Sequence, residues 1–188
     1  PDYKERILKQ FELHPEADII AFQVEGIERK YKSYYSNTRR VGFFRSMKIS
    51  SVEIAFRLNK IREKRLSFNE LFGAGSKYSH GEENIFLVDC LRSGLKILYV
   101  PVKIADLHMG ESTWFSGFNE EYLFNQGACL TAMSNSMSLL LILLFAVKKY
   151  KLFSSNYSIV ESIRYMLQGR KDYYQFRGEK GNEKCSIG

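Results

Sequence analysis

The helix–glycine–strand segment of residues 82–101 constrains the fold more than any other part of this sequence. Its first part carries apolar side chains at helical spacing, and Gly94 stands where a left-handed residue commonly ends a helix. An apolar run over 96–100 follows at once and is closed by Pro101. The pattern predicts a helix over 82–94 and then a buried strand, the unit from which α/β folds are built.

The rest of the chain divides into an α/β region and a helical region. Apolar runs predict strands over 18–24 and 51–57, and helical spacing predicts a first helix that ends near Leu13. A surface loop or an edge hairpin is expected over 26–48, and loops over 66–81 and 103–117. Helices are expected over 119–134, 138–150 and 158–168, the last ending at Gly169. We therefore expect an α/β domain over residues 1–118, a helical extension over 119–177 and a disordered tail over 178–188.

The basic residues are concentrated near the C-terminus. The chain has 28 Lys and Arg against 21 Asp and Glu, a net charge of +7. Residues 148–188 hold nine of these cations and four of these anions, a balance of +5. This distribution favours binding of an anionic surface by the C-terminal part of the chain over a nucleic-acid groove. Arg39, Arg40 and Arg45 stand among aromatic residues but match no recognition motif, so no nucleic-acid partner is expected.

The cysteines and the first residues bear on the cellular setting. Cys90, Cys129 and Cys185 are far apart and form no CxxC, which indicates neither a disulfide framework nor a zinc cluster and favours a reducing compartment. The charged start lacks an initiator methionine and a signal-peptide pattern. We expect a fragment of a cytoplasmic protein, peripheral on the inner face of the cell membrane.

The strongest candidate for chemistry is the run Gly81-Glu82-Glu83-Asn84. It follows a glycine-containing loop and opens the predicted helix, so its two carboxylates lie near the positive end of the helix dipole. One carboxylate that projects into a cleft there would accept a proton from a substrate hydroxyl. The alternative is that these glutamates only stabilise the start of the helix.

Two further candidates follow the predicted strand. His108 stands in the position of a metal ligand, although a lone histidine is more often simply hydrogen-bonded. The loop with Ser112, Thr113 and Trp114 holds the only tryptophan, whose flat ring suits stacking on a sugar. The alternative for Trp114 is a core position beneath the loop.

Taken in order, these residues resemble the second half of family 2 glycosyltransferases. The family's phrases are F-x-E-x-F-G, then G-E-D at a helix start, then G-x-x-I-x-Y-x-P and a histidine. They are matched in this chain by residues 68–73, residues 81–83, residues 94–101 and His108. The resemblance covers about residues 1–118, and the helical part is similar to the extension of bacterial members that build surface polysaccharide.

The resemblance implies a partial GT-A sheet and inverting transfer from a nucleotide-sugar donor to a saccharide or lipid-linked acceptor. Glu83 takes the place of the family's catalytic aspartate, and Glu82 is the other candidate for the base. Gly81, Ser112, Thr113 and Trp114 would contact substrate. His108 would complete a site for Mn²⁺ or Mg²⁺ with the family's Asp-x-Asp motif.

That motif is absent from the sequence. Its five aspartates include no pair at i and i+2. We expect that the donor-binding half is missing, so that these residues alone are not a competent enzyme.

The predicted helix at 138–150 suggests a different class of function. The nine uncharged apolar residues 139–147 are about half of the roughly 20 that span a bilayer. Lys148, Lys149 and Lys151 follow directly. The pattern predicts two amphipathic helices over 138–171 that lie on an anionic membrane surface, or else leucines that pack on the body. The alternative function is therefore a non-catalytic module that docks on a membrane surface or a partner.

Overall fold

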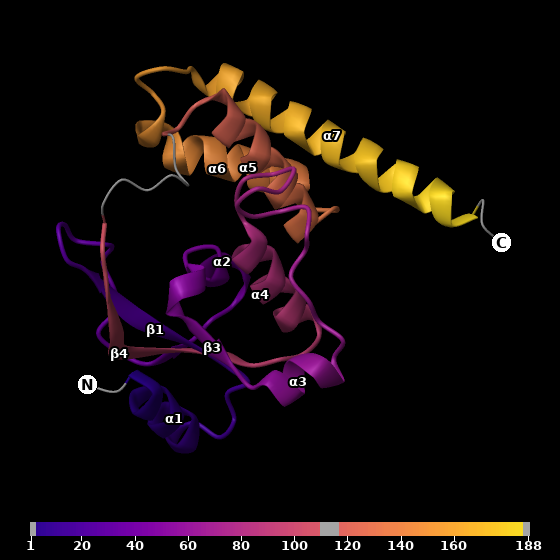
Figure 1. Ribbon diagram of the computed structural model, residues 1–188. Helices are drawn as coiled ribbons and strands as arrows, with labels where there is room; N and C mark the ends of the chain where they lie inside the picture. Colours follow the sequence, from indigo (N-terminus) through magenta and orange to yellow (C-terminus); the bar gives the residue numbers. More distant parts are fainter. Residues whose placement is uncertain (1–2, 110–116, 186–188) are drawn as a thin grey trace. The chain divides into compact units, whose positions relative to one another are not determined.

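The computed structural model describes the backbone of residues 3–109 and 117–185, which divides into two compact units (Figure 1). The first, here the sheet unit, comprises residues 1–68 and 83–112, and the second, the helical unit, comprises residues 69–82 and 113–188. The predicted α/β class followed by helices is confirmed. The division differs from the predicted boundary after residue 118, because residues 69–82 belong with the C-terminal helices.

The sheet unit contains a mixed four-stranded sheet in the order β2-β4-β1-β3. β1 and β4 are parallel, while β2 and β3 run antiparallel to their neighbours. In chain order the elements are α1 (Tyr3–Leu13), β1 (Ile19–Gly26), β2 (Arg39–Arg40), α2 (Phe43–Ser46), η1 (Ser51–Glu53), β3 (Ile54–Phe56), α3 (Leu58–Glu63), α4 (Glu82–Arg92) and β4 (Ile97–Leu107).

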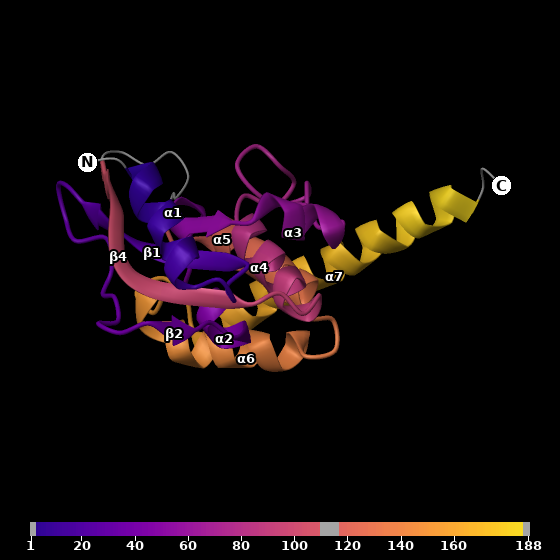
Figure 2. The ribbon, with the colours of Figure 1, turned by 90° about the horizontal axis from the view of Figure 1, so that it is seen from below.

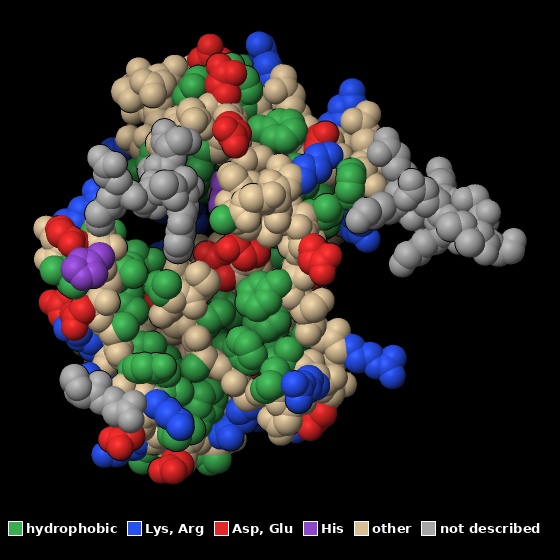
Figure 3. Space-filling view, in the orientation of Figure 1, with side chains coloured by type: hydrophobic (Ala, Val, Ile, Leu, Met, Phe, Trp, Pro, Cys, Tyr) green, Lys and Arg blue, Asp and Glu red, His purple; other side chains and the backbone are tan. Residues whose placement is uncertain are grey.

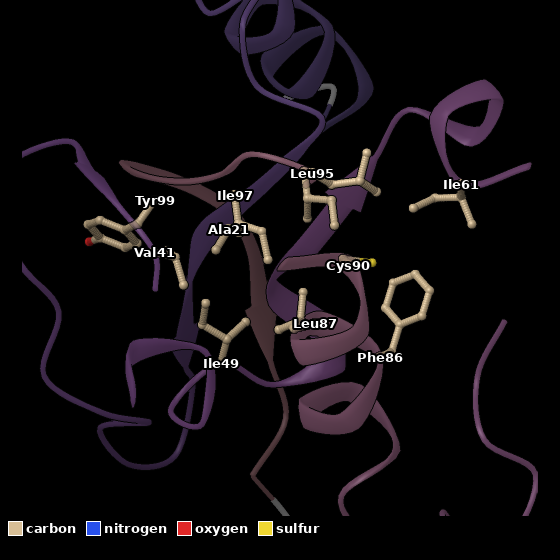
Figure 4. Packing of buried hydrophobic residues seen from close by; sticks show 11 residues of the cluster. Ala21, Val41, Ile49, Ile61, Phe86, Leu87, Cys90, Leu95, Ile97 and Tyr99 are labelled. Atoms are coloured by element: carbon tan, nitrogen blue, oxygen red, sulfur yellow. The ribbon is translucent and has the colours of Figure 1, made fainter. Parts of the chain in front are cut away.

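The central strand β1 is buried on both faces. Ile19 and Ala21 pack against buried side chains of α4 (Figure 4). Ile20 and Phe22 point the other way, because successive strand residues alternate, and they pack with the apolar face of α1. The two helices thus cover opposite faces of the sheet (Figure 1). Each buried isoleucine or phenylalanine side chain among them contributes about 1.5–3 kcal/mol to folding.

The predicted end of α4 at Gly94 is confirmed. Gly94 has a φ of +82°, a conformation that costs glycine little. Its N–H donates to the carbonyl of Leu91, and the N–H of Leu95 donates to the carbonyl of Cys90. These are the two bonds of a Schellman motif, which satisfies the last carbonyls of the helix. The chain then turns back into β4, so α4 and β4 run in opposite directions.

β4 is longer than predicted, because Pro101 does not end it. Ala21 of β1 lies opposite Tyr99, but Gln23 lies opposite Lys103, so two steps along β1 match four along β4. The extra residues form a bulge that contains Pro101, and a bulge tolerates a residue without an N–H. Figure 2 shows β4 bending along its length. The predicted loop from residue 103 is therefore wrong as far as Leu107.

The predicted strand over 51–57 is half correct. Residues 51–53 form the single 3₁₀ turn η1, and β3 covers the following three residues. A capping box fixes the turn, since Ser50 and Glu53 each bind the other's backbone N–H. The polar segment 26–48, predicted as a surface loop or an edge hairpin, contains the edge strand β2 and the short helix α2, and α3 follows β3. These are short elements without a clear periodic pattern.

The helical unit consists of the loop 69–82 and the C-terminal helices. The helices are α5 (Glu120–Met133), α6 (Ser138–Lys149), η2 (Tyr150–Leu152) and α7 (Ile159–Cys185). Asn119 caps α5 by accepting the N–H of Tyr122 at 2.8 Å. The loop is anchored by Tyr78, which is fully buried and donates its hydroxyl hydrogen bond to Asp172 of α7 at 2.7 Å.

α7 does not end at Gly169 as predicted, and it continues to Cys185 through residues assigned to a disordered tail. Gly169 is buried in the crossing of α5 and α7. A Cβ at this position would overlap the carbonyl oxygen of Phe124, and a Cβ on Gly127 would overlap the backbone of Met166. The two glycines therefore allow close backbone approach, which explains a glycine inside a helix.

Candidate functional site

The parallel strands bring several polar residues to one edge of the sheet unit. β1 and β4 end side by side, and the N–H of Ile27 donates to the carbonyl of Leu107 just past their last pair. Glu28 follows β1 and His108 follows β4. Because α4 runs opposite to β4, Glu83 in its first turn lies toward the same edge. Ligands of open α/β sheets bind beyond the carboxyl ends of parallel strands.

Glu83 acts electrostatically on Tyr31, which lies in the loop after β1. Burial raises the pKa of Tyr31, and the carboxylates of Glu53 and Glu83 raise it further. A hydrogen bond from its hydroxyl to Ser50 Oγ, 2.5 Å long, opposes the rise. Tyr31 is thus a neutral phenol near two carboxylates, able to donate or accept a hydrogen bond.

Glu53 is a buried carboxylate with two partners. Only 2% of its side chain is exposed, and it forms an ion pair with Lys32. It also accepts the backbone N–H of Ser50 at 2.7 Å. Lys32 lies 5.5 Å from the ring centroid of Tyr31, so the cation joins the carboxylate to the phenol. This arrangement satisfies Glu53 and makes it a structural group rather than a free base.

Asn84 fixes the first turn of α4. Its side-chain amide donates to the carbonyl oxygens of Ser46 and Ile49, at 3.2 and 3.0 Å. These carbonyls belong to the segment that joins α2 to η1. The start of α4, and with it the neighbouring Glu83, is therefore tied to the same loop that carries Ser50 and Glu53.

His108 lies on the surface and pairs with Glu28. Its side chain is 81% exposed, and its Nδ1 lies 2.8 Å from Glu28 Oε1. The second oxygen of Glu28 accepts the N–H of Met109 at 2.5 Å. The bond with His108 and that with Met109 lower the pKa of Glu28 to about 2. The pair brings together an ionised carboxylate and an imidazole that are 80 positions apart in the sequence.

His108 is expected to complete a divalent-metal site, and Glu28 is the donor beside it. Glu28 and His108 offer one carboxylate and one imidazole. Within residues 3–109 and 117–185 no group of three or more His, Cys, Asp and Glu side chains is placed to hold a metal ion. The described residues therefore do not make a divalent-metal site by themselves, and two donors are fewer than such ions take from a closed protein site.

Two of the predicted site residues lie in the helical unit. Gly81 has a φ of +100° and is buried, and a Cβ there would overlap Cys129 Sγ. This glycine is required by packing and by the backbone conformation. The Glu82 side chain lies against Gly73, since a Cβ added to that glycine would be 3.2 Å from the carboxyl carbon of Glu82. Ser112, Thr113 and Trp114 lie outside the described residues.

In the helical unit, the two residues before Gly81 form a polar cluster with side chains of α5. The His80 ring stacks on Tyr122 with centroids 4.7 Å apart, and its Nε2 lies 3.2 Å from Gln126 Oε1. Asn125 donates to Ser79 Oγ at 2.8 Å. Burial lowers the pKa of His80, with the Gln126 bond opposing the shift. Burial therefore favours the neutral form of His80, which stands two residues before Glu82.

Two of the arginines in the segment 26–48 lie in the short strand β2. Arg39 stacks on the ring of Tyr35 at 3.7 Å, and it shares β2 with Arg40, which pairs with β4. On the face of the sheet unit seen in Figure 3, basic and acidic side chains are intermixed. This distribution gives no support to a nucleic-acid groove there.

Sequence reasoning missed Glu28 and Tyr31. Neither stands in a recognisable motif, and their relevance depends on β1 and β4 being neighbours although about 80 residues separate them. The available signal was positional, because both lie in the segment that follows the apolar strand β1. Comparison with models of protein families, with curated proteins and with solved structures finds no match to this chain. Its function is therefore inferred from residues and geometry.

Proposed function

We propose that this chain is the catalytic-base and acceptor half of an inverting glycosyltransferase of the GT-A type. It would use a nucleotide-sugar donor and a saccharide or lipid-linked acceptor, in the synthesis of bacterial surface polysaccharide on the cytoplasmic side of the membrane. The proposal joins the resemblance to family 2 glycosyltransferases with the arrangement at the carboxyl edge of the sheet unit.

The observation that carries the proposal is the position of Glu83. It stands in the first turn of α4, at the edge where β1 and β4 end, next to an asparagine anchored by two hydrogen bonds. The backbone of Glu83 is thereby held in place, and its carboxylate lies near the positive end of the helix dipole. Such a group suits proton abstraction, which needs a positioned base within hydrogen-bond reach of the hydroxyl.

In the proposed step, Glu83 takes the proton of the acceptor hydroxyl as that oxygen attacks the anomeric carbon. The new bond joins the acceptor oxygen to that carbon, and the bond from the carbon to the donor diphosphate breaks. The diphosphate leaves with the electron pair, and the configuration at the carbon inverts. Tyr31, a neutral phenol near Glu83, would donate or accept a hydrogen bond to the acceptor.

A divalent ion remains part of the proposal only with additional ligands. Glu28 and His108 would be the donors from the described residues, and carboxylates of an Asp-x-Asp motif, which this sequence lacks, would have to join them. When bound, such an ion would neutralise the leaving diphosphate. No step above depends on it.

The test is sugar transfer by the full-length gene product carrying Glu83→Gln, measured with a panel of nucleotide-sugar donors. Loss of a general base lowers the rate by about 10²–10⁴-fold, while the circular dichroism spectrum and melting temperature stay those of the wild type. Glu82→Gln distinguishes the two candidates. Glu5→Gln, which removes a carboxylate from the first turn of α1, is the matched control and keeps full activity. Full transfer by Glu83→Gln would refute the role of Glu83.

A further inference from the structure

The two faces of α6 have different surroundings. Leu141, Ile142 and Ala146 are at most 2% exposed, so this face is part of the core of the helical unit. On the other face Leu139, Leu140, Leu143 and Val147 are 49–66% exposed. The apolar run therefore does not serve the core alone, because about half of it is directed to solvent.

These four exposed side chains, here the apolar stripe, lie together on the helix. At about 100° per residue they fall within an arc of about 100°, which is the width of a typical apolar helix face. Leu152, 45% exposed, follows in η2. An exposed stripe of this kind marks an interaction site more often than isolated apolar residues do.

The charges around the stripe are of one sign. Residues 122–160 contain Lys148, Lys149 and Lys151 and no Asp or Glu. All three lysines are exposed and stand directly after the stripe, in the last turn of α6 and in η2. A membrane or protein surface that covers the apolar stripe would therefore meet these lysines and no carboxylate of residues 122–160.

We propose that α6 lies in the plane of an anionic lipid surface, with the apolar stripe in the headgroup boundary and Lys148, Lys149 and Lys151 against lipid phosphates. A second copy of the chain would bring the same stripe and lysines but no carboxylate from this segment, whereas anionic lipids supply the complementary charge. None of the described helices is both long and apolar enough to cross a bilayer. The proposal does not depend on Glu83 being a base.

The test is flotation of the chain with vesicles of phosphatidylcholine alone and of phosphatidylcholine mixed with phosphatidylglycerol. The wild type should bind the mixed vesicles and bind the neutral ones far less. Each lysine near an anionic leaflet strengthens binding about fivefold, so the triple variant K148E/K149E/K151E should lose at least about 100-fold in partition coefficient.

The matched charge control is K9E/K30E/K64E, at three exposed lysines of the sheet unit. Both triple variants reverse three charges and take the net charge from +7 to +7 − 6 = +1. The control should keep most of its binding. The variant L139Q/L143Q should lose binding while its melting temperature stays close to wild type, whereas Leu141→Gln in the buried face should lower the melting temperature strongly.

Results of three kinds would overturn the proposal. The first is equal binding of the wild type to neutral and mixed vesicles, or equal losses in the two lysine variants. The second is a melting temperature of L139Q/L143Q as low as that of Leu141→Gln, which would mean that the stripe is covered within the chain. The third is a dimer, seen by sedimentation velocity, that L139Q/L143Q dissociates while vesicle binding is absent.

Discussion

The side-chain amide of Asn84 donates a hydrogen bond to the carbonyl oxygen of Ile49 at 3.0 Å and thereby joins the start of α4 to the loop before η1. The same amide binds the carbonyl of Ser46. Through these bonds a residue next to the proposed base is held by a segment 35 positions earlier in the chain. The position of the Glu83 backbone thus depends on tertiary structure as well as on the helix.

The first prediction is that Asn84→Ala destabilises the protein by about 1–3 kcal/mol, because the carbonyl oxygens of Ser46 and Ile49 each lose a hydrogen bond. If Glu83 is the base, kcat for sugar transfer also falls while KM for the donor changes little. Asn59→Ala, at an exposed position of α3, is the control and should change stability by less than about 0.5 kcal/mol. Urea denaturation of both variants provides the measurement, and equal effects would contradict the anchoring role.

The second prediction concerns the glycine at the crossing of α5 and α7. Replacing a helical glycine with alanine ordinarily stabilises by about 1 kcal/mol. Gly169→Ala should do the opposite and destabilise by about 1–3 kcal/mol, because the new methyl group overlaps the carbonyl oxygen of Phe124. Gly42→Ala is the control, since Gly42 has an extended conformation and open space around its Cβ position. A stabilised Gly169→Ala variant would rule out the close crossing.

Local signals explain what could be predicted from the sequence. α4 ends through two local hydrogen bonds, from the N–H of Gly94 to Leu91 and from the N–H of Leu95 to Cys90, and the apolar run of β1 is buried as its composition indicates. Pro101 and Gly169 misled for a common reason. Each residue type ends regular structure when considered locally, but in the fold one lies in a bulge of β4 and the other in a helix crossing.

The candidate site was predictable only in part. Glu83 and His108 stand out by their positions at a helix start and after a strand. Their neighbours Tyr31 and Glu28 come from the loop after β1, and that proximity arises from the pairing of two strands distant in sequence. Non-local pairing of this kind leaves no pattern in a single sequence.

The third prediction is a loss of stability on mild acidification through His80. Burial lowers the pKa of His80 in the folded state below its usual 6.5, so the unfolded state binds the proton more readily. The stabilisation is present above pH 6.5 and is lost as the pH falls below it. His80→Gln should remove this slope, which urea denaturation at pH 8, 7, 6 and 5 would measure. An unchanged slope in the variant would show that another group causes it.

The fourth prediction concerns Glu28 at lower pH. Its bonds to His108 and Met109 lower its pKa from 4.5 to about 2 in the folded state. The unfolded state therefore takes up the proton first, and the contribution of Glu28 is full above pH 4.5 and is lost as the pH falls toward 2. The stability difference between wild type and Glu28→Gln should accordingly be constant at neutral pH and shrink across this window.

The control for Glu28 is Glu5→Gln, at an exposed carboxylate in the first turn of α1. Because Glu28 is exposed, solvent screens its interactions, and the prediction is the pH window and the sign of the slope rather than a magnitude. Carbon-13 NMR of the Glu28 carboxyl gives the pKa directly. His108→Gln removes the imidazole partner and should move that pKa back toward 4.5. An ordinary pKa in the wild type would mean that the two side chains do not pair in solution.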